Sequence, residues 1–282
     1  MSESRLLHML LEPGGLRAVF QPVFDVSGHE KRLHSLECLI RGPVGSNLEK
    51  APVLFEYVRR KREEILIDRA CVSTALRAAA RLPWEPHLSV NVHASTLGRD
   101  PDFPLFLSDA AALYTISLDR LTIEIVEHTP YWDGPGFLCS LDAIRAMGVR
   151  IALDDIGLGQ SNYRMILDCR PEYFKIDRYF AHGCHDDPYR RAVLESIVHL
   201  AGKFEARIVA EGVEREQDFQ TVKAVGIDLI QGFLLSPALT PEALMESDFV
   251  RDELLEQDGV ASYEEEQTHL SSETGGRPPC WK

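Results

Sequence analysis

Residues 121–126 read Leu121-Thr-Ile-Glu-Ile-Val126, an apolar β-like run with a carboxylate inside it. Side chains alternate between the two faces of a strand, so Ile123 and Ile125 share one face and Glu124 points to the other. The isoleucines suit a covering layer of helices, which leaves Glu124 facing the interior of a barrel. A carboxylate embedded in an apolar strand is costly unless it is paired or binds a cation. The run therefore predicts a barrel strand that carries a polar site.

Seven further β-like runs are spaced along the chain. They are Val19–Val26, Leu36–Ile40, Leu88–Val92, Val149–Asp154, Tyr173–Asp177, Arg207–Ala210 and Asp228–Ile230. The first two are joined through Ser27-Gly28 and read as a hairpin. From the second run onward the gaps hold helix-like stretches, including Ile65–Arg81, Gly136–Met147, Pro188–Phe204 and Glu216–Val225. Alternation of this kind implies parallel pairing. We predict an α/β fold, a (β/α)8 TIM-like barrel whose first strand runs antiparallel to the rest.

Length and composition bear on the domain organisation. The chain has 282 residues, 45% of them hydrophobic, which suits one barrel or two small domains. No linker interrupts residues 15–245, so we expect one barrel domain over residues 1–257. Residues 258–282 carry too little apolar surface to offset the entropy of ordering the chain. They are expected to form a disordered, acidic and polar tail.

The charge balance excludes one class of partner. Lys and Arg total 30 against 44 Asp and Glu, a net charge of −14, whereas proteins that bind a nucleic-acid polymer show a basic footprint. No run approaches the roughly 18 apolar residues of a membrane helix, and the amino terminus does not resemble a secretory signal. The six cysteines lack C-x-x-C spacing, which indicates reduced thiols and a cytoplasmic protein.

Polar side chains recur at the carboxyl ends of the expected strands, where barrel enzymes carry their catalytic residues. They are Glu37, Asn91, Glu124, Asp154, Asp155, Lys175, Glu211 and Gln231. Carboxylates that converge on one mouth would repel each other unless a cation joined them. Oxygen ligands suit Mg²⁺ or Mn²⁺ better than Zn²⁺.

Each of these residues also has a simpler interpretation. Asp154-Asp155 could cap a helix, Lys175 could pair structurally with Asp177, and Glu214 could lie in the first turn of the next helix. The recurrence of polar residues at successive strand ends favours a site over these separate explanations.

Histidines give weaker signals than the strand ends. His182 and His185 could suggest zinc, but Asp187-Pro188 reads better as the start of a helix. His93 and His128, just beyond two strands, are expected to be solvated histidines at the rim of the site.

The ordered motifs resemble EAL-domain phosphodiesterases over residues 15–245. The matching segments are Phe20-Gln-Pro-Val, Leu36-Glu-Cys-Leu-Ile-Arg41, Ser89-Val-Asn91-Val, Ile123-Glu-Ile-Val-Glu127, Ile151-Ala-Leu-Asp-Asp-Ile-Gly, Phe174-Lys-Ile-Asp-Arg178, Val209-Ala-Glu-Gly-Val-Glu214 and Gln231-Gly-Phe. The resemblance implies hydrolysis of cyclic di-GMP (c-di-GMP) to linear pGpG by in-line attack of water, with two Mg²⁺ or Mn²⁺ ions. It also implies a homodimer.

The same resemblance assigns roles to single residues. It implies metal ligands at Glu37, Asn91, Glu124, Asp154, Asp155 and Glu211, with Lys175 and Glu211 as catalytic residues. Substrate contacts are implied at Gln21, Arg41 and Gln231. Glu127 is expected to tether the loop after the fifth strand, and Glu214 and Gln231 are expected to support the site from behind.

Two departures from the family pattern stand out. Cys38 replaces the alanine of the Glu-Ala-Leu motif, and the loop after the fifth strand reads Asp-Asp-Ile-Gly-Leu-Gly-Gln-Ser, where Phe and Thr or Ala are usual. In the family this loop helps to place the second metal ion, so its departure is expected to affect the catalytic rate more than the binding of c-di-GMP. One alternative is a catalytically weak c-di-GMP receptor or protein-docking module, which the resemblance implies for family members that lose metal ligands; none of the expected ligands is missing here. An unrelated barrel hydrolase of another phosphate ester is a second.

Overall fold

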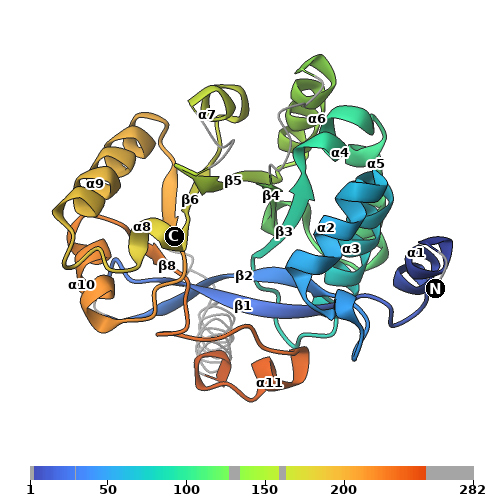
Figure 1. The fold of residues 1–282 in the computed structure, drawn as a ribbon, viewed down its shortest axis with the longest axis horizontal. Coiled ribbons are helices and arrows are strands. Elements are labelled where there is room, and N and C mark those ends of the chain that lie inside the picture. The colour runs from blue at the N-terminus through green and yellow to red at the C-terminus, as the bar shows by residue number, and fades with distance from the viewer. Residues whose placement is uncertain (1–2, 29, 127–133, 159–162, 252–282) are drawn as a thin grey trace, which may run out of the picture.

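The computed structural model describes residues 3–28, 30–126, 134–158 and 163–251, and within them the strands close into a barrel in chain order (Figure 1). The strands are β1 Arg17–Asp25, β2 Arg32–Arg41, β3 Leu88–His93, β4 Leu121–Val126, β5 Arg150–Ile156, β6 Tyr173–Ile176, β7 Arg207–Ala210 and β8 Leu229–Ile230. β1 pairs antiparallel with both β2 and β8, whereas neighbours from β2 to β8 pair in parallel. The predicted barrel and its reversed first strand are confirmed.

Helices surround the barrel, with α2 to α5 along one flank and α9 and α10 along the other (Figure 1). The helices are α1 Glu3–Leu11, α2 Ala51–Lys61, α3 Glu64–Ala79, α4 Ala94–Arg99, α5 Phe103–Leu113, α6 Gly134–Ala146, α7 Tyr163–Cys169, α8 Arg178–Ala181, α9 Pro188–Lys203, α10 Glu216–Ala224 and α11 Pro241–Met245, with 3-10 turns η1 Asn47–Glu49 and η2 Leu118–Arg120. The Asp187 side chain accepts hydrogen bonds from the backbone N–H groups of Tyr189 and Arg190, which confirms the predicted start of α9.

The isoleucines of β4 pack as the alternation predicts. Ile123 and Ile125 are fully buried in the main hydrophobic core, and Glu124 between them is 3% exposed. The core continues into the surrounding helices through side chains such as Ile67 and Leu107. The apolar face of β4 is therefore covered by the helical layer, as expected.

The interior of the barrel is layered along its strands. Lys175 and Glu211 belong to the layer at the carboxyl ends. Two residues earlier on their strands lie Tyr173 and Val209, which form a small apolar cluster together with Val23 and Leu229. This cluster separates the polar residues at the two ends of the barrel.

No helix in the described ranges is long and apolar enough to cross a membrane. The tail predicted at residues 258–282 lies outside the described residues, so its disorder stays a prediction.

Candidate active site

Lys175 on β6 lies at the centre of a group of carboxylates. Its Nζ is 2.5 Å from Oε2 of Glu124 and 2.6 Å from Oε1 of Glu211. Oε2 of Glu37 is 3.3 Å from this nitrogen and Oδ1 of Asp154 is 3.7 Å from it. Each of these residues comes from a different strand or, for Glu211, from the residue that follows β7, so closure of the barrel brings them together.

Asp177, the structural partner considered above for Lys175, makes a different contact. Asp177 accepts a hydrogen bond from the backbone N–H of Tyr179 at 2.7 Å and caps α8. A structural pair with Asp177 therefore does not account for the burial of Lys175, which is 2% exposed.

Two amide side chains hold Glu37 in place. Asn91 Nδ2 donates to Oε1 of Glu37 at 2.9 Å, and Gln231 Nε2 donates to Oε2 at 2.7 Å. Gln231 is 4% exposed, and its Oε1 has no hydrogen-bond partner among the described residues. The structure thus places Gln231 directly behind Glu37.

The end of β5 turns sharply at Asp155. This residue has a φ of 53°, and its backbone N–H donates to Oδ1 of Asp154 at 3.0 Å. A left-handed backbone is unfavourable for residues other than glycine and tends to occur at functional sites. One carboxylate oxygen from each of Asp154, Asp155 and Glu211 lies within 4.8 Å of the others, which is a spacing that a metal ion can bridge. Neither aspartate caps a helix, because β5 continues to Ile156.

The electrostatics show that the group is short of positive charge. Burial and repulsion from Glu37 raise the pKa of Glu124 to about 8. Burial and the neighbouring Asp154 raise the pKa of Asp155 to about 6. Burial also raises the pKa of Glu211 well above its usual value, despite the attraction of Lys175. One ammonium group therefore cannot keep all of these acids ionised near neutral pH.

Glu37 behaves differently from the other acids. Burial opposes its ionisation, but Lys175 and the hydrogen bonds from Gln231 and Asn91 outweigh burial and lower its pKa. The same acids raise the pKa of Lys175 well above its usual value, against the opposing effect of burial. Lys175 is therefore a permanent cation at the centre of the site.

The donor set fits divalent cations that prefer oxygen. The carboxylates of Glu37, Glu124, Asp154, Asp155 and Glu211 and the amide oxygen of Asn91 provide hard ligands. Mg²⁺ and Mn²⁺ favour such ligands, whereas zinc sites usually include His or Cys. A cation would also supply the positive charge that the raised pKa values of Glu124 and Glu211 show to be missing.

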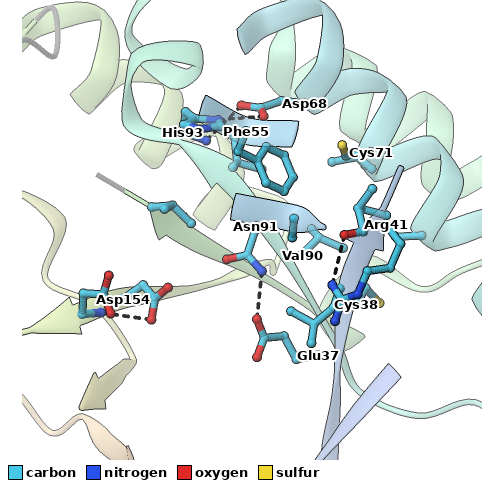
Figure 2. Close-up of a pocket in the computed structure, with 18 residues that line it drawn as sticks. Glu37, Cys38, Arg41, Phe55, Asp68, Cys71, Val90, Asn91, His93 and Asp154 are labelled. Carbon is cyan, nitrogen blue, oxygen red and sulfur yellow. Dashed lines mark hydrogen bonds and ion pairs between the residues drawn. The ribbon is translucent and has the colours of Figure 1, made fainter. Parts of the chain in front are cut away.

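A pocket of about 260 Å³ opens beside this group and extends between β2, β3 and the helices α2 and α3. Figure 2 shows Asn91 and Glu37 facing each other in it, with Asp154 across from them and Phe55, Asp68 and His93 at another part of its wall. It therefore offers apolar and polar walls next to the carboxylates.

Two of the residues predicted to contact the substrate lie on the first two strands: Gln21 is on β1, and Arg41, the predicted phosphate contact, is on β2. Arg41 lines the pocket, and its Nη1 donates to the backbone oxygen of Ile40 at 3.1 Å. Burial lowers the pKa of Arg41, and Glu37 opposes that effect. Gln21 pairs in register with Glu37 across the two strands, and its Nε2 lies 3.5 Å from the backbone oxygen of Ser236.

The structure corrects the interpretation of His93 as a solvated residue. His93 is 7% exposed, and its Nδ1 lies 2.9 Å from Oδ1 of Asp68. The other oxygen of Asp68 accepts hydrogen bonds from the backbone N–H of His93 and from Oγ1 of Thr96. Asp68 and Phe55 come from helices α3 and α2, so the pattern of polar residues at strand ends did not predict them. The acid at the end of the apolar stretch Ile65-Leu-Ile-Asp68 is the sequence feature that could have indicated a buried polar contact at Asp68.

Some expected residues lie apart from the carboxylates or outside the described ranges. Glu214 pairs with Arg178 at 3.2 Å and precedes α10, which begins at Glu216. Glu127 and His128 lie outside the described residues. His185 pairs with Asp218 at 2.7 Å, and among the described residues no metal-binding group of His, Cys or acids includes His182 or His185.

The acid-rich group lies at the carboxyl ends of parallel strands, which is where barrel enzymes carry their active sites. The model of the EAL domain family matches residues 4–238, and the chain belongs to this family.

Curated relatives agree with this membership. Cyclic di-GMP phosphodiesterase PA2567 of Pseudomonas aeruginosa is 32% identical over 82% of this chain and 39% of its own length. The probable cyclic di-GMP phosphodiesterase PdeG of Escherichia coli is 27% identical over 83% of this chain and 47% of its own length. The chain spans less than half the length of these relatives.

Solved structures show the same fold. The calcium and c-di-GMP complex of BlrP1 from Klebsiella pneumoniae has a TM-score of 0.72 at 27% identity, covering 80% of this chain and 56% of that chain. A standalone EAL protein from Vibrio cholerae O395, bound to c-di-GMP, has a TM-score of 0.71 at 24% identity, covering 80% and 93%. The second likeness supports the fold alone.

Proposed function

We propose that this chain is a metal-dependent phosphodiesterase that hydrolyses c-di-GMP to linear pGpG. The observation that carries the proposal is a cluster of five carboxylates that is short of positive charge: four of them lie within 4 Å of the single ammonium of Lys175, and two, Glu37 and Glu124, are buried. The names of its relatives supply the substrate class: PA2567 is called a cyclic di-GMP phosphodiesterase, and the BlrP1 structure contains c-di-GMP with calcium.

Two ions, Mg²⁺ or Mn²⁺, are proposed for the site. Glu37, Asn91, Glu124 and Asp154 would hold one ion, and Asp155 and Glu211 would hold the second. The short spacing among Asp154, Asp155 and Glu211 supports a cation beside Asp155 and Glu211, with Asp154 close enough to contact it as well. When bound, such a pair of ions lowers the pKa of water and stabilises the leaving oxygen of an in-line displacement.

The side chains of the chain have separate tasks in this proposal. Lys175 stays protonated and places a fixed positive charge beside the reacting phosphate, with Glu211 as its neighbour and as an acceptor for the proton of the attacking water. Arg41 contributes a charge-assisted contact to the phosphate that does not react. Asn91 and Gln231 hold the carboxylate of Glu37, and Gln21 and Gln231 are proposed to contact the substrate.

The direct test is to incubate purified protein with c-di-GMP and to resolve the products by chromatography. We expect pGpG with Mg²⁺ or Mn²⁺ and none in excess chelator. Product formation in chelator would contradict the metal mechanism. Tight binding of c-di-GMP without product in either metal would favour the receptor or docking alternative, to which the unusual loop after β5 points.

The expected homodimer is a further proposal, which rests on the family resemblance. Light scattering should give twice the 31.7 kDa mass of the chain. A mass equal to one chain at micromolar concentration would contradict it.

A further inference from the structure

Asp155 and Glu211, the carboxylates proposed to hold the second ion, each lie within two residues of a glycine with a left-handed backbone. Gly157 has a φ of 94°, and Gly212 has a φ of 60°. Asp155 itself has a φ of 53°, which is unfavourable for a residue with a side chain. A strained backbone of this kind persists only where its surroundings hold it in place. The neighbours of these two glycines therefore decide how the carboxylates are positioned.

The short helix α8 packs against both glycines. A Cβ atom at position 157 would lie 2.8 Å from the ring of Phe180, and one at position 212 would overlap the Cβ of Arg178. Only glycine allows so close an approach, because it has no Cβ. Phe180 and Arg178 both belong to α8, which follows β6, the strand that carries Lys175. One helix therefore contacts the segments that carry both carboxylates.

The loop after β5 has little other support next to Gly157. Ile156 is 3% exposed, belongs to the main core and pairs with Ile176 of β6. Beyond it, Gly157 and Leu158 border a pocket of about 940 Å³, which Phe180 also lines. Among the described residues, the three atoms nearest to a Cβ at position 157 all belong to the Phe180 ring. This ring therefore supports the loop at Gly157.

We propose that α8 positions Asp155 and Glu211 for the second ion, with Phe180 and Arg178 as its positioning residues. The inference rests on the two-ion site of the proposed function. Arg178 meets Gly212, the residue directly after Glu211, so its contact acts on the backbone next to that carboxylate.

Phe180 acts on Asp155 across a turn. Its ring holds Gly157, and the backbone N–H of Leu158 donates to the backbone oxygen of Asp155 at 3.0 Å. This hydrogen bond closes the turn that contains Gly157, so a shift of the glycine moves Asp155. Three of the four proposed ligands of the first ion come from β2, β3 and β4, which are outside the loops that α8 contacts. Loss of the α8 contacts should therefore affect the second ion more than the first.

Electron paramagnetic resonance of the full chain titrated with Mn²⁺ tests the role of Phe180. Ions in two-metal sites lie about 3.5–4 Å apart and couple magnetically, so loss of the second ion leaves the spectrum of a single ion. Phe180→Ala should weaken the second ion and lower kcat for pGpG formation by about tenfold or more, with the first ion unchanged. Tyr189→Ala is the matched control, because it removes an 83% exposed ring from the same pocket. It should bind both ions as the wild type does.

Two results for Phe180→Ala would overturn the proposal. An unchanged coupled spectrum with unchanged kcat would show that the ring does not position Asp155. Equal weakening of both ions would show that the ring supports the barrel in general.

Gly212→Ala tests the contact with Arg178. The added Cβ overlaps Arg178, so the second ion should again bind about tenfold more weakly or worse. Gly14→Ala is the matched control, because Gly14 has a φ of 84° and a Cβ there meets no atom within 4 Å. It carries the same kind of backbone penalty without the overlap and should keep both ions. Equal metal binding in the two variants would contradict a role for Arg178.

A double variant shows whether Phe180 acts through Gly157. Gly157→Ala alone should weaken the second ion, because its Cβ meets the ring. The combination of Gly157→Ala with Phe180→Ala should be no weaker than the weaker single variant, since residues in contact have non-additive effects. Losses that multiply in the double variant would contradict action through this contact.

The same experiments separate this inference from the proposed function. Wild-type protein that forms pGpG, with a coupled spectrum that survives Phe180→Ala and Gly212→Ala, would refute the role of α8 and leave the function intact. Wild-type protein that forms no pGpG and shows no coupled pair would refute the proposed function, and the role of α8 with it.

Discussion

The two ends of the barrel balance their charged side chains in opposite ways. At the amino-terminal end, Nη2 of Arg207 lies 2.7 Å from Oδ2 of Asp25, and its Nη1 lies 3.4 Å from Nδ1 of His34. At the carboxyl end, Lys175 faces an excess of acids. The first group contains its own counter-charges, whereas the second requires charge from outside.

The pKa values express the same difference. Burial opposes the ionisation of Asp25, but hydrogen bonds from Ser27 and Arg207 lower its pKa to about 2. Burial and the nearby Arg207 lower the pKa of His34 to about 4, so it is neutral beside the guanidinium. Near neutral pH these groups are in the protonation states that their contacts favour, whereas Glu124, with a pKa of about 8, is not ionised without a further cation. A group of charges that cannot balance itself is the stronger indication of a functional site.

The largest expected effect is on catalysis at the carboxyl end. Glu37→Ala removes a proposed metal ligand and the acceptor of two amide hydrogen bonds. We expect kcat to fall by at least the roughly 10²–10³-fold that follows the loss of one donor that stabilises a transition state. The assay is pGpG formation at saturating Mg²⁺. Glu195→Ala on the exposed face of α9 is the matched control and should be unchanged. A near-normal kcat for Glu37→Ala would refute the assignment of β2.

The next effect separates binding from chemistry. Arg41→Ala removes a proposed contact to the non-reacting phosphate, so the affinity for c-di-GMP should fall by about tenfold or more while kcat changes less. Comparison of KM with kcat, and of equilibrium binding in Ca²⁺, measures the two parts. A loss confined to kcat would instead place Arg41 at the reacting phosphate.

Metal binding should depend on pH in a direction set by the raised pKa values. Below about pH 8 Glu124 is protonated in the metal-free protein, and below about pH 6 so is Asp155. Ligands must lose their protons to bind a metal, so Mn²⁺ binding at pH 7 should release protons and its affinity should rise with pH. Calorimetry in buffers of different ionisation enthalpy measures the release. An affinity independent of pH between 6 and 8 would show that these acids do not bind the ion.

At the amino-terminal end the expected effect is on stability. Arg207→Met breaks the contact with Asp25 and should lower the free energy of unfolding by about 1–2 kcal/mol, because the pair is charge-assisted but partly exposed.

Acid should reduce this difference. Asp25 has a pKa lowered in the folded state, so its contribution is complete above pH 4 and is lost as the pH falls towards 2. Denaturant titrations of wild type and variant from pH 7 to pH 3 measure the change, and kcat should be unaffected. A large loss of activity without loss of stability would contradict the separation of the two ends.

Alternation within strands was enough to predict which side chains of β4 and β6 face the interior of the barrel. Glu124 between two isoleucines and Lys175 between Phe174 and Ile176 could be assigned to the interior because a strand reverses its facing at every residue. The reversed β1 followed from the hairpin turn at Ser27-Gly28.

Contacts that depend on packing between separate elements could not be predicted in this way. Asp68 reaches His93 from a helix, so this contact depends on how α3 packs beside β3. Likewise, the sequence did not indicate which of several acids Lys175 would contact.

Anomalous scattering from crystals grown with Mn²⁺ and c-di-GMP tests the central claim that the carboxyl end is completed by cations. We expect two manganese peaks, one against Glu37, Asn91, Glu124 and Asp154 and the other against Asp155 and Glu211, with a phosphate of c-di-GMP beside them. An absence of manganese at these carboxylates, with c-di-GMP bound beside Lys175, would contradict it.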